Sequence, residues 1–240
     1  MAGGSLALLT EQVAGRVGTV RRRLLAYRYL SGTGIEIGAL HKPLKVPRSA
    51  RVRYVDRLEV DELREQYPEL ADHDLVAPDV VDDAETLASI PDRSQDFVIA
   101  NHLLEHTENP LLALTNMLRV LRAGGVVYLA VPDKRFTFDV DRPTTPLAHV
   151  VADFERGPER SRREHFEEWV RLVDKTPDPE VDVQVEALLA RGYSIHFHVW
   201  TYEDVLELLE ELRSRTDDRF ELAAAQRNGH ENVFVLRKVA

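Results

Sequence analysis

The stretch Gly34-Ile-Glu-Ile-Gly-Ala39 predicts a short buried strand that breaks into a turn at Gly38. The stretch Val52-Arg-Tyr-Val-Asp56 predicts a second strand. It ends in an acid, Asp56, which lies twenty residues after Glu36. A glycine at the first strand tip leaves room for a ligand, and a carboxylate at the second accepts hydrogen bonds from ribose hydroxyls. The pair therefore indicates a site for an adenosine-type nucleoside, without saying which one.

The composition is that of a globular protein with an ample core. The chain has 240 residues, of which 44% are apolar and 30% are charged, enough for one large domain or two small ones. It has no cysteine, which excludes disulfides, thiolate catalysis and cysteine-ligated zinc. A net charge of -10 argues against a general nucleic-acid-binding protein, because such proteins need a basic face.

Residues 1–30 differ from the rest, with five arginines against a single acid, Glu11. Their apolar residues recur at spacings of three or four and predict an amphipathic helix: Leu6, Leu9, Val13, Val17, Val20 and Leu24. We expect this helix to pack on the edge of the domain or on a partner subunit, with membrane-surface contact as the alternative. The segment lacks the apolar core of a signal peptide or membrane span, so the expected location is cytoplasmic. If the helix packs on a partner subunit, the protein is a homo-oligomer.

Strand and helix patterns alternate between residues 34 and 133. Strands are predicted at 34–37, 51–55, 75–81, 96–100 and 126–131, the third interrupted by Pro78. Helices are predicted at 59–66 and from Asn109-Pro110 to Gly124-Gly125, where an N-cap and a pair of glycines bound the apolar stripe. This alternation predicts an α/β fold with a parallel sheet.

The second half of the chain begins with a stretch that breaks this rhythm. Residues 134–192 are rich in charge and proline and predict helices at 160–173 and 181–191. We expect them to form a helical lid over the ligand-binding edge, within one domain that spans 31–240. A capping box from Thr201 to Asp204 then starts another helix. Strands at 220–225 and 232–239 flank an Asn-Gly turn and predict a hairpin.

Two further motifs carry a family resemblance: Asp96-Phe-Val-Ile-Ala-Asn-His-Leu-Leu-Glu-His106 and Arg119-Val-Leu-Arg-Ala-Gly-Gly-Val126. With the first two strands, they make residues 32–133, and more faintly 196–240, resemble class I S-adenosylmethionine-dependent methyltransferases, the methyltransferase type 11-like family in particular. The resemblance implies a Rossmann-like sheet of seven mostly parallel strands that ends in a reversed hairpin. It also implies S-adenosylmethionine as cofactor and S-adenosylhomocysteine as product.

The resemblance assigns cofactor contacts along the strand tips. The methionine end is assigned to Glu36, Gly38 and Ala39, the ribose to Asp56 with Arg57 beside it, the adenine to Asp83 and Ala84, and the sulfonium to Asn101 and His102. Asp56 as a strand cap and Asp83 as a loop acid are the structural alternatives. The chain has Leu40 and Lys42 where the family has two more glycines, which would crowd a pyrophosphate and so favours S-adenosylmethionine over a dinucleotide.

The histidines are the candidates for the acceptor side. Methyl transfer needs alignment, plus a base when the nucleophile is a hydroxyl, and His102 follows the fourth strand where this fold presents groups to the acceptor. His106 is expected to pack structurally, and His165 lies in the charged insertion. His196 and His198 would face the same side of a strand. Both are predicted to act as bases or to contact the substrate. Structural packing is one alternative, and a metal held together with Asp133 or Asp139 is the other. Of these interpretations the metal is the least favoured, so no metal is expected.

A charged cluster after the fifth strand completes the predicted site. Asp133, Lys134, Arg135 and Asp139 suit a polar acceptor with several hydroxyls or a carboxylate, and a salt-bridged loop is the alternative. The sequence thus predicts O-methylation of a small sugar or secondary-metabolite hydroxyl. N-methylation of an amine, and a non-catalytic scaffold that binds S-adenosylmethionine, remain the alternative functions.

Overall fold

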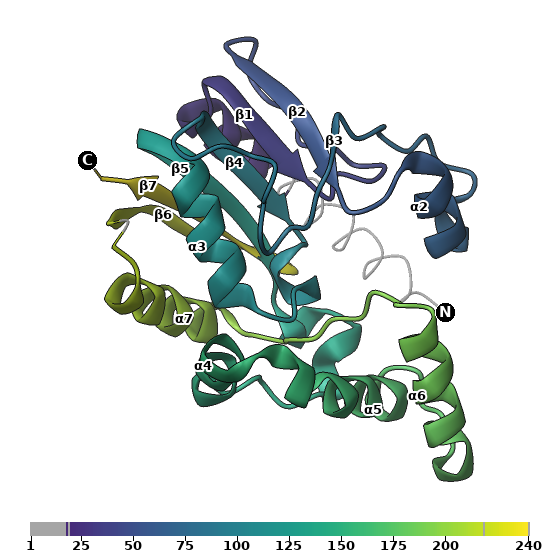
Figure 1. Ribbon diagram of the computed structural model, residues 1–240. Coiled ribbons are helices and arrows are strands. Elements are labelled where there is room, and N and C mark those ends of the chain that lie inside the picture. The colour runs from purple at the N-terminus through teal and green to yellow at the C-terminus, as the bar shows by residue number, and fades with distance from the viewer. Residues whose placement is uncertain (1–17, 19, 218, 240) are drawn as a thin grey trace, which may run out of the picture.

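The computed structural model describes residues 18, 20–217 and 219–239. Within them, seven strands form one sheet in the order β3-β2-β1-β4-β5-β7-β6 (Figure 1). The strands are β1 Gly32–Ile37, β2 Ala50–Asp56, β3 Val80–Val81, β4 Gln95–Asn101, β5 Leu121–Pro132, β6 Phe220–Asn228 and β7 Glu231–Lys238. Only β7 is antiparallel to its neighbours among these strands, which confirms the predicted mostly parallel sheet with a C-terminal hairpin.

The main helices are α2 Val60–Gln66, α3 Pro110–Val120, α4 Leu147–Arg156, α5 Arg162–Leu172, α6 Val181–Ala190 and α7 Tyr202–Arg215, and residues 20–29 are also helical. The predicted caps are confirmed at two of them. The Asn109 side chain accepts a hydrogen bond from the Leu112 amide at the start of α3. Thr201 and Asp204 form the capping box of α7. These caps satisfy amide groups that a helix leaves without partners in its first turn.

Two sequence predictions are wrong in their bounds, and one helix was missed. The third strand is confined to β3, because Pro78 has no amide proton to extend a ladder over 75–81. Helix α3 ends at Val120 and not at the glycine pair, since Leu121 is already extended and starts β5. Gly124, with a φ of 80°, lies in the irregular start of that strand. Helix α4 was not predicted at all, although its apolar residues recur at helical spacing.

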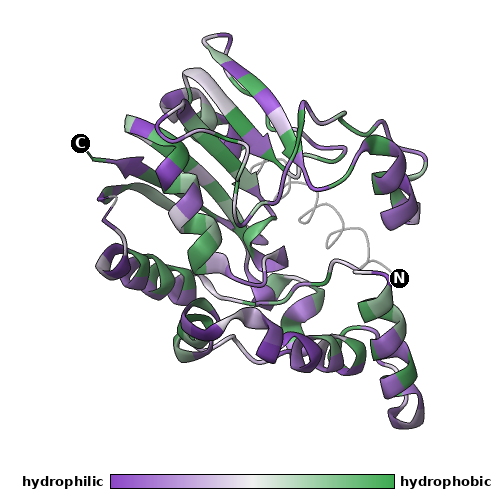
Figure 2. Cartoon of the chain, viewed as in Figure 1, coloured by the Kyte–Doolittle hydropathy of each residue, from purple (hydrophilic) through white to green (hydrophobic). Residues whose placement is uncertain are grey.

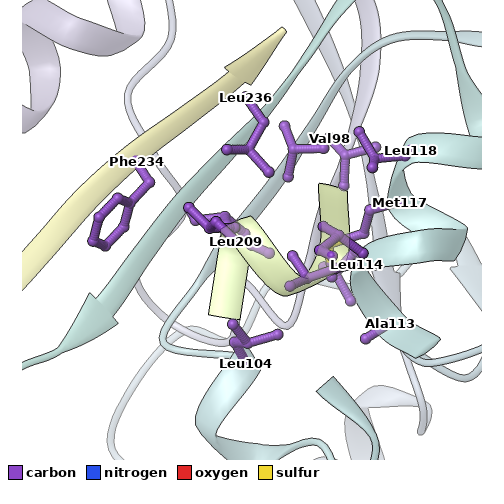
Figure 3. Close-up of a cluster of buried hydrophobic side chains, with 14 of the residues drawn as sticks. Val98, Leu104, Ala113, Leu114, Met117, Leu118, Leu209, Phe234 and Leu236 are labelled. Atoms are coloured by element: carbon purple, nitrogen blue, oxygen red, sulfur yellow. The ribbon is translucent and has the colours of Figure 1, made fainter. Parts of the chain in front are cut away.

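Both faces of the sheet are covered. On one face, side chains of β4, β7, α3 and α7 meet in the main apolar cluster, where Val98, Met117, Leu209 and Phe234 are buried (Figure 3). In Figure 2 the central strands are mostly hydrophobic, whereas the helices alternate hydrophobic and hydrophilic residues. Burying one face of each helix on the sheet is the main favourable contribution to folding.

The helix at residues 20–29 covers the opposite face of the sheet. It packs through Ala26 and Leu30 against Tyr128 and its apolar neighbours. Val20 and Leu24, two members of the predicted stripe, are 56% and 64% exposed, so the stripe is not the face that packs here. The other four members lie outside the described residues. No helix in the described ranges is long and apolar enough to cross a bilayer.

The insertion forms a helical layer beside the sheet. Helices α4, α5 and α6 lie along one end of the sheet (Figure 1). A separate apolar cluster holds α5 and α6 to the segment that follows them, and it contains Phe166, Trp169, Val170, Val181, Val185, Leu188, Ile195 and Phe197. The predicted helical character of 134–192 is confirmed, while its action as a lid stays a prediction.

Gly34 is the position in β1 where a side chain has no space. It pairs with Phe97 of β4, and an added Cβ would lie well inside van der Waals contact with the Phe97 carbonyl oxygen and ring. We expect Gly34→Ala to lower the free energy of unfolding by about 1–3 kcal/mol or more, through forced separation of two central strands. Denaturant unfolding measures the change, with Thr33→Ala at the exposed neighbouring position as control. Equal stability of the two variants would contradict the packing of this strand pair.

Candidate active site

A cavity of about 600 Å³ lies between the carboxyl ends of the central strands and the insertion. Open α/β sheets bind ligands in this place, beyond the carboxyl ends of their strands. From the sheet side it is lined by residues that follow β1, β2, β3 and β4, namely Gly38, Leu40, Asp56, Arg57, Asp83, Ala84, His102 and Leu103. From the insertion and the segment after it, the lining residues include Arg162, Phe166, Leu189, Tyr193, Ser194 and Phe197.

The turn after β1 keeps the backbone that a glycine-rich loop would have. Gly38 has a φ of 67°, and an added Cβ there would touch the Leu103 side chain at 3.4 Å. Leu40 has a φ of 47°, a left-handed conformation that is uncommon for a residue with a side chain. The chain therefore preserves the turn but adds a leucine side chain to the cavity wall.

Asp56 presents a carboxylate at the carboxyl end of β2. Its Oδ1 accepts a hydrogen bond from the Arg57 amide at 2.8 Å, which leaves further lone pairs on both oxygens for a ligand. Burial raises the pKa of Asp56, and the hydrogen bond and charge of Arg57 oppose that rise. Arg57 Nη2 also lies 3.5 Å from the Gly192 carbonyl, so this residue joins the sheet edge to the insertion.

The loop after β3 contributes a small residue and a structured acid. Ala84 lines the cavity, and so does Asp83. Asp83 Oδ1 accepts hydrogen bonds from the Glu85 and Thr86 amides at 2.9 and 3.0 Å. Asp83 therefore stabilises its own loop, which was the structural alternative to adenine binding. It also borders the space where an adenine would lie.

His102 and Glu231 form a dyad at the sheet edge. His102 Nε2 lies 2.7 Å from Glu231 Oε2, and its Nδ1 lies 3.6 Å from Glu105 Oε1. Burial opposes protonation of His102, but the hydrogen bond to Glu231 and the charges of both carboxylates outweigh it and raise the pKa of His102. Nε2–H donating to Glu231 leaves the Nδ1 lone pair free, which is the arrangement of an oriented general base.

Glu231 is a site residue that sequence reasoning missed. It is the first residue of β7, and because β7 is antiparallel, its amino end lies beside the carboxyl ends of the other strands. Arg22 Nη1 and Asn228 Nδ2 also donate to the Glu231 carboxylate, at 3.1 and 2.7 Å. The only local signal was an acid directly after the predicted hairpin turn.

One family model matches the first part of the described chain. Residues 31–129 match the family model described as a methyltransferase domain. This range holds β1 to β4, α3 and most of β5, and therefore the turn after β1, Asp56 and His102.

The match covers less than half of the chain, and together with the strand order of the sheet it is consistent with the fold of class I S-adenosylmethionine-dependent methyltransferases.

Solved structures share the fold of this methyltransferase domain at low sequence identity. A Haloferax volcanii methyltransferase in complex with the Trm112 methyltransferase activator is 14% identical, covering 96% of this chain and 93% of that one, with a TM-score of 0.53. A Rhodobacter sphaeroides structure described as a Zn-dependent alcohol dehydrogenase is 19% identical, covering 94% and 90%, with a TM-score of 0.55. At these identities the likeness shows the fold alone. No curated protein matches the sequence.

Three predicted cofactor contacts of the methyltransferase domain lie outside the cavity lining: Glu36, Ala39 and Asn101. Glu36 is 1% exposed, and its two carboxylate oxygens lie 2.9 and 3.1 Å from the Leu44 amide. Asn101 Nδ2 lies 3.4 Å from Glu36 Oε1. Both side chains thus contribute to the structure of the turn after β1, and their predicted ligand contacts gain no support.

The predicted acceptor residues also lie away from the cavity of the methyltransferase domain. The Asp133 carboxylate binds the Arg135 guanidinium at 2.8 and 2.7 Å, and Lys134 donates to the Val140 carbonyl. Asp139 is buried and binds Arg142 at 2.9 Å, so the cluster has the salt-bridged geometry that was its alternative. None of these four charged residues lines the cavity.

His196 and His198 do not act as a pair. The segment 193–200 forms neither helix nor strand, so the two imidazoles are not held to one side. His196 Nδ1 lies 2.7 Å from Asp139 Oδ2, whereas His198 Nε2 lies 3.2 Å from the Glu108 carbonyl. His106, expected to pack structurally, does line the cavity; burial is the main cause that lowers its pKa to about 3.

The buried Glu36 makes the stability of the domain depend on pH. Burial raises the pKa of Glu36 from an ordinary 4.5 to about 7, so the folded state holds a proton that the unfolded state releases earlier. Stability from this group is complete below about pH 4.5 and is lost as the pH rises to about 7, a difference on the order of 3 kcal/mol. We expect Glu36→Gln, which can still accept from the Leu44 amide, to be the more stable protein at pH 8.

Unfolding curves of both proteins at several pH values measure this effect. The gain from Glu36→Gln should shrink toward pH 4.5, where the wild-type carboxyl is already neutral in the folded state. A loss of stability in Glu36→Gln that is equal at all pH values would contradict the assignment.

Proposed function

We propose that the domain binds S-adenosylmethionine in the cavity and methylates a hydroxyl oxygen of a small polar acceptor. The observation that carries this proposal is that His102, which is hydrogen-bonded to Glu231 behind it, lines the same cavity as Gly38 and Asp56. When bound, the cofactor supplies a methyl carbon activated by a positive sulfur. The residues of the chain then have to hold both partners in line and remove the proton of the hydroxyl.

The cofactor assignment is supported by what each strand tip offers. Gly38 leaves the space beside Leu103 open, and Asp56 keeps carboxylate lone pairs for two ribose hydroxyls. Ala84 gives a small wall after β3. Carboxylate, open turn and small residue are the chemistry that a nucleoside needs, and none of them supplies the backbone cradle of a pyrophosphate.

The acceptor assignment rests on the dyad and on the far wall of the cavity. A hydroxyl is a poor nucleophile until it loses its proton, whereas an amine can attack from its neutral form, so an oriented base favours an oxygen acceptor. The insertion and the segment after it add aromatic faces at Phe166, Tyr193 and Phe197, with Arg162 and Ser194 as polar groups. A volume of about 600 Å³ that must hold cofactor and acceptor together fits a small acceptor, such as one sugar ring or a small metabolite.

Acceptor pairs that differ in one group test the proposal. Hexoses and phenols would be compared with the corresponding amino compounds, and release of S-adenosylhomocysteine would be followed for each. We expect turnover with members of the hydroxyl series that does not occur with their amino counterparts. Turnover of the amines alone would replace the proposal by N-methylation. Tight cofactor binding without turnover of any acceptor in an extract of small metabolites would favour a scaffold.

A further inference from the structure

A cluster of histidines lies below the cavity wall, apart from the His102–Glu231 dyad. It joins His149 and Asp153 of α4, His165 of α5 and His198 of the segment 193–200. One ring nitrogen from each of the three histidines lies within 4.8 Å of the other two. The cluster is largely closed to solvent, since His198 is fully buried and Asp153 and His165 are 4% and 9% exposed. Three chain segments therefore converge on one buried polar point.

Ring nitrogens of the three histidines lie near enough to one another to bind one ion, and Asp153 contacts this group through His149. His149 Nε2 lies 2.9 Å from His165 Nε2 and 3.1 Å from Asp153 Oδ2. With metal–ligand bonds of about 2.0–2.1 Å, tetrahedral zinc sets its nitrogen and oxygen ligands somewhat more than 3 Å apart. The ring centroid of His198 is 5.0 Å from that of His165 and 5.9 Å from that of His149.

Counting protons shows that the cluster has more acceptors than donors. His149 and His165 can share one proton between their facing nitrogens. His198 Nδ1 is buried and has no hydrogen-bond partner among the described residues, and Asp153 Oδ2 lies 3.1 Å from His149 Nε2. A buried lone pair without a donor costs about 1–3 kcal/mol. A cation among the three imidazoles would satisfy the lone pair of His198 and would replace the shared proton.

The outer atoms of these side chains are already held, as they are around bound metals. His198 Nε2 lies 3.2 Å from the Glu108 carbonyl, and Asp153 Oδ1 accepts from the Ser161 hydroxyl at 2.7 Å. His165 makes a backbone hydrogen bond with Phe197. Such second contacts fix the tautomer and direction of metal ligands. Burial is also the main cause that lowers the pKa of His165 to about 3, and it lowers that of His198, which keeps both rings neutral.

We propose that His149, His165 and His198 bind one zinc ion, with Asp153 beside His149. Three imidazoles suit zinc, whereas magnesium and calcium prefer oxygen ligands throughout. The ion would tie α4, α5 and the segment 193–200 together beneath the cavity wall formed by Glu108, Phe166 and Phe197. This site is independent of the proposed methyl transfer, and it replaces the sequence expectation that the chain binds no metal.

Zinc stoichiometry tests the site directly. The full-length protein would be stripped with a chelator and titrated with zinc in competition with a chromophoric chelator. We expect one zinc ion per chain, and cobalt in its place should give the absorption of a tetrahedral site. His165→Gln and His198→Gln should weaken zinc binding by more than the ~10–100-fold that loss of an outer contact costs. His73→Gln, at an exposed histidine, serves as control and should bind zinc as the wild type does.

Thermal unfolding keeps the test decisive if a buried variant fails to fold. Equimolar zinc should raise the Tm of the stripped wild type and of His73→Gln, because the folded state alone assembles the three ligands. His149→Gln replaces the most exposed ligand, with a side chain 29% exposed, and its Tm should not rise. A wild type that takes up no zinc, or variants that bind it equally well, would overturn the proposal.

Discussion

Replacing Asp56 by alanine should weaken the binding of S-adenosylmethionine and S-adenosylhomocysteine on the order of 100- to 1,000-fold. The carboxylate at the tip of β2 is assigned to two ribose hydroxyls, and each charge-assisted hydrogen bond contributes about 1.5–3 kcal/mol. Among the described residues, the Asp56 side chain accepts hydrogen bonds only from the neighbouring amides of Arg57 and Leu58, so the packing of the sheet depends little on it. Calorimetric titration of the variant with S-adenosylhomocysteine measures the loss.

A matched control separates the ribose contact from a general loss of negative charge. Asp61 lies five residues further along the chain, on α2, with a side chain that is 95% exposed. Asp61→Ala should bind both ligands as the wild type does. Asp56→Asn should fall between wild type and Asp56→Ala, since an amide can still accept one hydrogen bond. Unchanged affinity in Asp56→Ala would show that the ribose lies elsewhere.

Replacing His102 by asparagine should lower kcat by about 10²- to 10⁴-fold while leaving cofactor affinity nearly unchanged. The imidazole acts as a base only when it is neutral, and the carboxylates of Glu231 and Glu105 raise the pKa of His102 above its ordinary 6.5. Turnover by the wild type should therefore rise with pH through an apparent pKa above that value. Initial rates of S-adenosylhomocysteine release across pH provide the measurement.

The variant Glu231→Gln tests whether the dyad acts as a base, because a purely structural role would leave the pH dependence of the rate unchanged. Glu231→Gln removes the hydrogen-bonded charge that raises the pKa of His102, so the rate profile should shift to lower pH. Titration of the His102 ring followed by NMR should shift in the same direction. His230, an exposed histidine whose ring centroid is 6.2 Å from that of His102, is the control, and His230→Asn should keep the wild-type profile. An unshifted profile in Glu231→Gln would exclude the dyad as the base.

The cofactor half of the site could be predicted because its signals are local. A glycine that ends β1 and an acid that ends β2 are set by neighbouring residues, and the parallel sheet then brings the two tips to one edge. The length of β3 could not be predicted in the same way, because Pro78 shortens it within an apolar run. The geometry of the turn after β1 could be predicted only in part, because Leu40 adopts a backbone conformation that favours glycine.

The acceptor half could not be predicted because its contacts join distant parts of the chain. His102 and Glu231 are 129 residues apart and meet only because β7 is reversed. His196 and His198 share a strand-like spacing, yet their segment follows its contacts with Asp139 and the Glu108 carbonyl instead of a strand period. His149, the proposed zinc ligand on α4, was missed together with that helix.

Calorimetric titration of the wild-type protein with S-adenosylhomocysteine shows whether the cavity is a site for S-adenosylmethionine. We expect a single site per chain that also binds S-adenosylmethionine and does not bind NAD, since the cavity offers a ribose carboxylate but no pyrophosphate cradle. Binding of NAD, with no heat from either sulfur-containing ligand, would contradict this expectation.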